Sequence, residues 1–77
     1  METIKLLEVV ALTEDFPDHG LRRGEVGTVV EILAPGVFEV EFSDDTGEAY
    51  AFASLRAEQL IPLYHRKREA AAVPEAA

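Results

Sequence analysis

The chain has 77 residues, of which 48% are hydrophobic and 29% charged, and it contains no cysteine. A chain of this length forms one domain and buries only about 60% of the surface that its unfolded form exposes. Disulfides and thiolate zinc sites are excluded, so close packing or a partner must supply the stability, and a homo-oligomer stays open. The formal net charge of −8 disfavours functions that depend on neutralising phosphates, so nucleic acid is a poor candidate partner.

The first predicted element is a strand over Leu6–Leu12, which is nearly apolar on both faces and is expected to pack from both sides. Residues Thr13–Gly24 contain Asp, Pro and Gly and predict a loop. A second strand follows, because Gly24 and Gly27 open a β-branched run that alternates through Ile32. The two glycines predict a bend and a close backbone approach at the start of that strand.

The next two elements form a predicted hairpin. Pro35-Gly36 favours a turn, and Phe38–Phe42 alternates apolar and acidic residues with a period of two. A two-residue loop would set Ile32 opposite Glu39, so we predict one extra residue, a β-bulge, near Leu33–Val37. In the bulged register the following residues share the core face: Thr28, Val30, Ile32, Phe38, Val40 and Phe42.

A second turn is predicted at Ser43–Gly47, where Gly47 can take a positive φ. It leads into a strand over 48–54, on which Tyr50 and Phe52 share one face. The alanines between them leave room on the opposite face for another backbone or a partner surface to come close.

The remaining elements complete an all-β fold. Leu55–Leu60 has the length of one helical turn, and Ile61–Leu63 predicts a short edge strand because it contains proline. Five strands with a single-turn helix before the last strand predict a small SH3-like barrel over residues 1–63. The charged, alanine-rich tail over 64–77 is expected to be flexible, with one helical turn at its start.

The candidate interaction site is acidic. In the bulged register Glu31 lies near Glu39, and Glu41 follows on the same outer face, so like charges crowd together where a cationic partner would relieve them. The alternative is an outer face that is simply solvated. The Asp44-Asp45 turn extends the acidic surface, and Tyr50 or Phe52 would add an aromatic anchor if exposed.

Arg22 and Arg23 are the only adjacent basic pair in residues 1–63. Together they can grip a carboxylate or phosphate with two parallel hydrogen bonds. The alternative is that they neutralise nearby acids: Glu25, Glu31 or Glu48. The candidate partner-binding residues are therefore Glu31, Glu39, Glu41, Asp44, Asp45, Arg22 and Arg23.

No catalytic, cofactor or metal residues are predicted. Gly24 and Gly27 are not followed by the Lys-Ser/Thr of a phosphate loop, and Asp44-Asp45 supplies too few spaced oxygens for a calcium loop. His19 and His65 have no triad or ligand spacing and are expected to be exposed titratable groups. The sequence therefore predicts a protein that is not an enzyme.

The order of these motifs resembles a known family. Lys5–Leu12, Gly20–Val30, Phe38–Phe42 and Ala57–Leu60 are together similar to the small bacterial proteins of the domain of unknown function 4926 family, over about residues 4 to 63. The resemblance implies an SH3-like barrel in a stand-alone bacterial protein and implies no activity. The Gly24 to Gly27 spacing is similar to KOW-type barrels, and Gly20 to Phe42 is more distantly similar to the barrel of the nitrile hydratase β subunit.

These observations predict a non-catalytic protein–protein interaction module that binds a basic protein, as an antitoxin or immunity-like partner would. A KOW-like nucleic-acid or ribosome-associated module using Arg22, Arg23 and Arg66-Lys67-Arg68 is the first alternative, and an accessory subunit of a metalloenzyme is the second. The first residues lack a cationic signal region and an apolar span, so we expect a cytoplasmic protein with no membrane partner.

Overall fold

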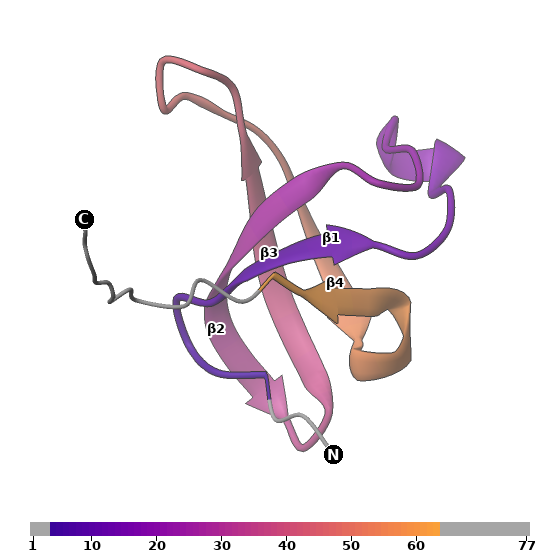
Figure 1. Cartoon of the computed structure of the whole chain (residues 1–77), viewed down its shortest axis with the longest axis vertical. Helices are drawn as coiled ribbons and strands as arrows, with labels where there is room; N and C mark the ends of the chain where they lie inside the picture. Colours follow the sequence, from indigo (N-terminus) through magenta and orange to yellow (C-terminus); the bar gives the residue numbers. More distant parts are fainter. Residues whose placement is uncertain (1–3, 64–77) are drawn as a thin grey trace, which may run out of the picture.

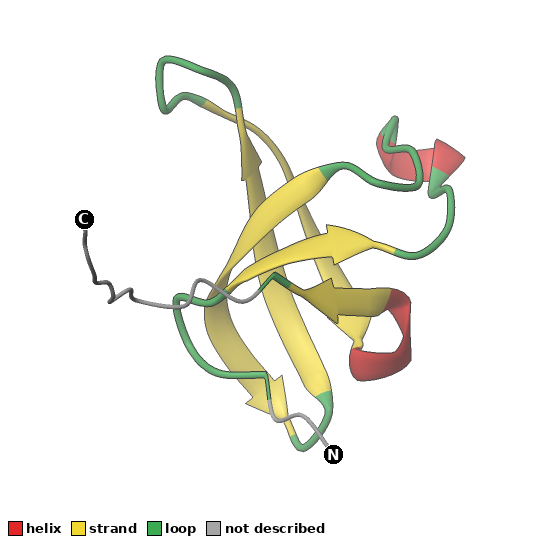
Figure 2. Ribbon diagram, in the orientation of Figure 1, coloured by secondary structure: helices red, strands yellow, loops and turns green. Residues whose placement is uncertain are grey.

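The computed structural model describes residues 4–63 (Figures 1 and 2). They form one five-stranded antiparallel sheet in the order β4-β3-β2-β1-β5, with a single-turn 3₁₀ helix before the last strand. The strands are β1 (Val9–Leu12), β2 (Val26–Ala34), β3 (Val37–Ser43), β4 (Ala49–Arg56) and β5 (Leu60–Pro62). Two 3₁₀ turns, η1 (Pro17–His19) and η2 (Ala57–Gln59), complete the set. The prediction of a small all-β, SH3-like fold is confirmed.

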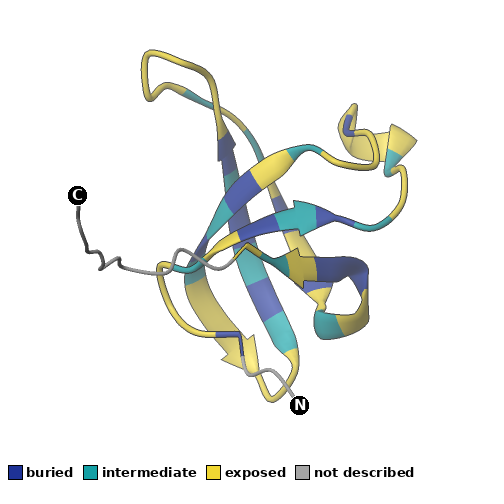
Figure 3. Cartoon of the chain, viewed as in Figure 1, coloured by how far each residue is buried: buried dark blue, intermediate teal, exposed yellow. Residues whose placement is uncertain are grey.

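The sheet folds over on itself, so that β1 crosses β3 and β4 in Figure 1. The core lies between these layers, and β3 alternates buried and partly buried residues along its length (Figure 3). Phe38, Val40 and Phe42 are all buried, as the period-two pattern predicts. The other buried apolar residues are Ile4, Val10, Leu12, Leu21, Val29, Ala53, Leu55 and Leu60.

Gly27 marks a close approach between β2 and β3. A Cβ atom at this position would lie 2.7 Å from Cγ1 of Val40 and 2.8 Å from the carbonyl oxygen of Glu41. Gly24 takes a φ of +90° just before β2, and its N–H donates to the Leu12 carbonyl. The predicted bend and close approach at the two glycines are therefore confirmed.

The first strand is shorter than predicted. Leu6 and Leu7 are exposed and lie in a turn in which the Glu8 N–H donates to the Lys5 carbonyl at 3.0 Å. The Glu8 carboxylate accepts the Lys5 N–H at 2.8 Å, and Leu7 takes a φ of +69°. These hydrogen bonds hold the segment in a turn, so β1 begins only at Val9. Its buried residues alternate with less buried ones, so the strand is buried on one side only.

The register of β2 is only partly as predicted. The irregularity near its end is present between Ile32 and Ala34, but a second lies between Val29 and Glu31. The second irregularity exchanges the residues that face the core on the two sides of it, so Val29 pairs with Val40 and is buried. The prediction that Thr28 and Val30 face the core is therefore wrong. Ile32 pairs with Phe38 as predicted, yet remains half-exposed.

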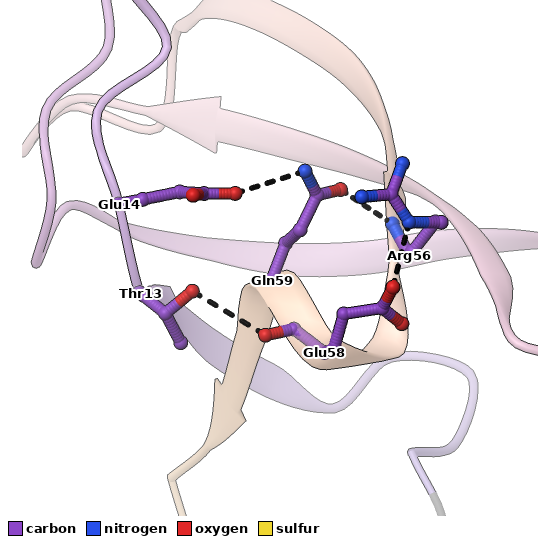
Figure 4. A network of polar contacts seen from close by, with 5 residues as sticks. All are labelled: Thr13, Glu14, Arg56, Glu58 and Gln59. Atoms are coloured by element: carbon purple, nitrogen blue, oxygen red, sulfur yellow. Dashed lines mark hydrogen bonds and ion pairs between the residues drawn. The ribbon is translucent and has the colours of Figure 1, made fainter.

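The join between β4 and β5 is held by side chains (Figure 4). The buried Gln59 accepts the Arg56 N–H at 2.9 Å and donates to the Glu14 carboxylate at 3.1 Å, so both ends of its amide are satisfied. The Thr13 hydroxyl donates to the Glu58 carbonyl at 3.4 Å. Because β4 continues to Arg56, the helical turn is shorter than predicted. The edge strand lies one residue earlier, and the predicted tail over 64–77 lies outside the described residues.

Candidate functional site

An acidic pair lies directly across the β2–β3 hairpin. Glu31 is the cross-strand partner of Glu39, which is the pairing the bulged register predicts. Directly opposed residues have Cβ atoms about 5 Å apart, so two carboxylates at these positions repel each other. Glu31 is exposed and Glu39 is partly buried. The hairpin therefore holds two like charges side by side at the surface.

Glu41 extends this acidic surface into the next outward row. It is the partner of Thr28 on β2 and of Phe52 on β4, while Glu39 is the partner of Ser54. The Ser54 hydroxyl donates to the Glu39 carboxylate at 3.0 Å and orients it. We call Glu31, Glu39 and Glu41 the acidic face. Phe52 is 52% exposed, so an aromatic ring stands at one side of this face.

The two aspartates of the β3–β4 turn have different roles. One carboxylate oxygen of Asp44 accepts the N–H and hydroxyl of Thr46, at 2.9 and 2.8 Å, and the N–H of Glu48 at 3.0 Å. These hydrogen bonds, the Thr46 hydroxyl first, lower the pKa of Asp44 below its usual 3.8. Asp44 thus organises the turn, whereas Asp45 is exposed beside it.

The backbone N–H groups of Arg22 and Arg23 both donate hydrogen bonds to nearby carboxylates. The Arg22 N–H donates to Glu25 at 2.9 Å and the Arg23 N–H donates to Asp15 at 2.8 Å. The ion pair among residues 4–63 is between Arg56 and Glu58. Neither the Arg22 nor the Arg23 guanidinium therefore forms an ion pair with Glu25, Glu31 or Glu48 in this part of the chain.

Arg22 also borders a shallow surface cavity of about 300 Å³ in the β1–β2 loop. Its other lining residues are Asp15, Pro17, Gly20 and Leu21. The two arginines precede β2, whereas Glu31 lies about 17 Å along that strand from Val26. The structure therefore does not bring the predicted basic and acidic residues together.

Glu25 connects two parts of the chain that sequence reasoning did not join. Its carboxylate accepts the Tyr50 hydroxyl at 2.7 Å, and this hydrogen bond is the main cause that raises the pKa of Tyr50. The other oxygen of the same carboxylate accepts the Arg22 N–H. Tyr50 is still 54% exposed, so its ring lies at the surface while its hydroxyl anchors the start of β2.

Other kinds of site are not built by the described part of the chain. No three Asp, Glu or His side chains within residues 4–63 gather in a way that could hold a metal ion. His19 lies exposed in η1, and His65 is outside the described residues. No helix among residues 4–63 is long and apolar enough to cross a membrane.

The architecture and the acidic face define a small five-stranded antiparallel β protein with a charged outer sheet surface. Its sequence matches the family described as Domain of unknown function (DUF4926) over residues 6–62. The chain belongs to that family, and the resemblance inferred from its motifs is confirmed. No curated protein and no solved structure matches it.

Proposed function

We propose that the protein is a non-catalytic interaction module whose acidic face binds a basic protein. The observation that carries the proposal is the direct pairing of Glu31 with Glu39, with Glu41 in the next row. Like charges directly opposite each other destabilise a sheet. The ion pair within residues 4–63 involves Arg56 and Glu58, so the acidic face has no cation of its own there. A basic partner would remove the repulsion.

The neighbouring aromatic ring supports the same proposal. Protein interfaces concentrate their binding energy in aromatic and arginine anchors surrounded by polar contacts. Phe52 is half-exposed and lies across from Glu41 on the outer face. A partner that fits this surface carries lysine or arginine side chains beside an apolar patch, so that the patch covers Phe52 while the cations meet the acidic face.

The proposed setting is a bacterial cytoplasm, in which this chain is the small acidic member of a two-protein pair, as an antitoxin or immunity protein is. Its net charge of −8 suits fast association with a basic partner, because opposite net charges steer encounters. The absence of cysteine is compatible with a reducing compartment.

The test is co-purification of the tagged full chain from its source cells, with and without nuclease, at moderate salt. The proposal predicts a stoichiometric basic protein that stays bound after nuclease and is released as the salt concentration rises. Recovery of nucleic acid alone would contradict it, as would recovery of an acidic or neutral protein whose binding does not change with salt concentration.

A nucleic-acid module is the second candidate, supported by the exposed Arg22 and Arg23 side chains, whose guanidinium groups form no ion pair within residues 4–63. It predicts binding that falls linearly with salt on logarithmic axes, and that is lost when Arg66-Lys67-Arg68 is deleted. The net charge of −8 opposes it. Binding that does not weaken with salt would remove this candidate.

A further inference from the structure

The two edges of the sheet differ in how well they are protected. Natural edge strands avoid pairing with other chains by being short or by carrying proline or lysine. The β5 edge has three residues and includes Pro62. The β4 edge has eight residues, contains neither proline nor lysine, and exposes Tyr50 and Phe52. The β4 edge is therefore the less protected of the two, although a bulge at Tyr50 interrupts its ladder with β3 and it carries one charged residue, Arg56.

The backbone groups that β4 leaves free can be assigned from its pairing with β3. The Ala57 N–H donates to the Gly36 carbonyl at 3.0 Å, and antiparallel pairs alternate between bonded and non-bonded. Counting back along the register, Leu55 and Ala53 exchange hydrogen bonds with β3. The N–H and C=O groups of the residues between them, including Ser54, therefore point to the open edge.

Arg56 follows the same alternation, because its N–H turns away from β3 and donates to the Gln59 side chain at 2.9 Å. Phe52 and Ser54 have no comparable partner for their backbone groups within residues 4–63, where β4 pairs only with β3. Their edge-facing backbone groups thus lie beside an outward, half-exposed aromatic ring. This combination is suited to receiving another strand.

We propose that this edge is a homodimerisation site, at which the β4 strands of two copies pair antiparallel about a two-fold axis at Ala53. This register opposes Phe52 of one copy to Ser54 of the other, and the two symmetric pairs give roughly four backbone hydrogen bonds. The regular part of the overlap covers residues 51–55 of both strands, because Tyr50 lies in the bulge of β4.

The second copy fits this edge because the strand is complementary to itself. The register brings Arg56 of each copy to the end of the overlap where the bulged Tyr50 of the other copy lies, so a guanidinium can approach an aromatic face. The Tyr50 hydroxyl is bonded to the Glu25 carboxylate, so the arriving arginine also meets a negative charge. Arg56 keeps its own Glu58 partner through Nε, so its remaining N–H groups are the ones that meet the aromatic ring and the carboxylate of the other copy.

The dimer should be weak and favoured by salt. Four half-exposed rings contribute only about 400 Å², so the interface lies at the small end of specific interfaces, with a Kd on the order of 10 μM. Each copy carries a net charge of −8, and screening this repulsion should strengthen the dimer. The inferred dimer uses the edge of β4 and not the acidic face itself. It shares Phe52 with the surface proposed for the basic partner, and it requires no other protein.

Sedimentation velocity of the full chain from about 1 to 300 μM is the first test. The expected result is a monomer–dimer equilibrium that shifts towards dimer as salt is raised. Ser54→Pro removes an edge-facing N–H without removing a bond to β3, so its Kd should rise by at least about tenfold. Ser54→Ala loses the hydroxyl bond to Glu39 but keeps the N–H, and it should dimerise like the wild type.

Amide hydrogen exchange tests the edge without any substitution. In the dimer the amides of Phe52 and Ser54 should gain protection as protein concentration rises, while those of Ala53 and Leu55 should be protected throughout. A monomer at every concentration would overturn the proposal. A dimer in which Phe52 and Ser54 still exchange rapidly would also overturn it, as would concentration-independent protection of both amides in a monomer.

Discussion

The two faces that β2, β3 and β4 present differ in composition: one is apolar and buried in the core, and the other is polar and faces solvent. The inner row joins Val29, Val40 and Ala53, which are all buried and apolar, whereas the outer row joins two glutamates and a serine: Glu31, Glu39 and Ser54. Packing explains the inner row completely. Nothing in folding requires two opposed carboxylates, so the outer row is the surface on which we propose that a partner binds.

The largest effect is expected on the inner face, from Gly27→Ala. The added methyl group would lie 2.7 Å from Val40 and 2.9 Å from the Phe42 ring, both of which are buried. Overpacking of this kind costs about 3 kcal/mol of unfolding free energy, because strand and core must both shift. Urea denaturation monitored by far-UV circular dichroism measures it.

The matched control for this substitution is Gly47→Ala. Gly47 has open space around it but takes a φ of +86°, so its replacement measures only the cost of a left-handed residue, about 1 kcal/mol. If Gly27→Ala were no more destabilising than Gly47→Ala, the close approach that organises the inner face would be wrong.

A smaller effect of the opposite sign is expected on the outer face, from Glu31→Lys. The substitution converts an opposed like-charge pair into an ion pair with Glu39, so the free energy of unfolding should rise by about 0.5 kcal/mol. The gain should disappear in 1 M salt, because exposed charges are then screened. Asp18→Lys makes the same charge change in η1. An equal gain there would show that only net charge matters.

The smallest effect is expected in the turn between β3 and β4. The pKa of Asp44 is lowered by its hydrogen bonds, so its ionised form stabilises the folded state above pH about 4, and this contribution fades as pH falls through the lowered pKa. Asp44→Asn should therefore melt below the wild type at pH 7, and the gap should narrow below pH 4.

The control in the same turn is Asp45→Asn, which removes a neighbouring carboxylate that accepts no hydrogen bond in the turn. Thermal unfolding followed by circular dichroism between pH 7 and pH 3 gives the comparison. A gap between wild type and Asp44→Asn that stays constant down to pH 3 would mean that Asp44 does not act through its charge.

The sequence predicts this fold best where one pattern dominates. The strict alternation from Phe38 to Phe42 sets the core face of β3, and counting across the turn places Glu31 opposite Glu39. The irregularity around Val30 is invisible in the sequence, because valine occupies both of the positions that it could expose. Local periodicity therefore predicts faces but not every change of face.

Two further features depend on contacts that no local pattern reports. Leu6 and Leu7 are apolar and fit a strand, yet the Glu8 side chain closes a turn around them and Leu7 takes a positive φ, which leucine disfavours. Glu25 and Tyr50 are 25 residues apart in sequence and meet only once the sheet has folded over. Side-chain hydrogen bonds across the sheet therefore require the structure.

The central claim is that the acidic face holds a basic protein, and the most direct measurement repeats the capture experiment with charge-reversed chains. Glu31→Lys/Glu41→Lys changes the face while keeping Glu39 with its Ser54 hydrogen bond. Asp18→Lys/Glu48→Lys makes the same change in net charge away from that face. The account predicts loss of the basic partner with the first variant only. Equal retention, or equal loss, of that partner by both variants would contradict it.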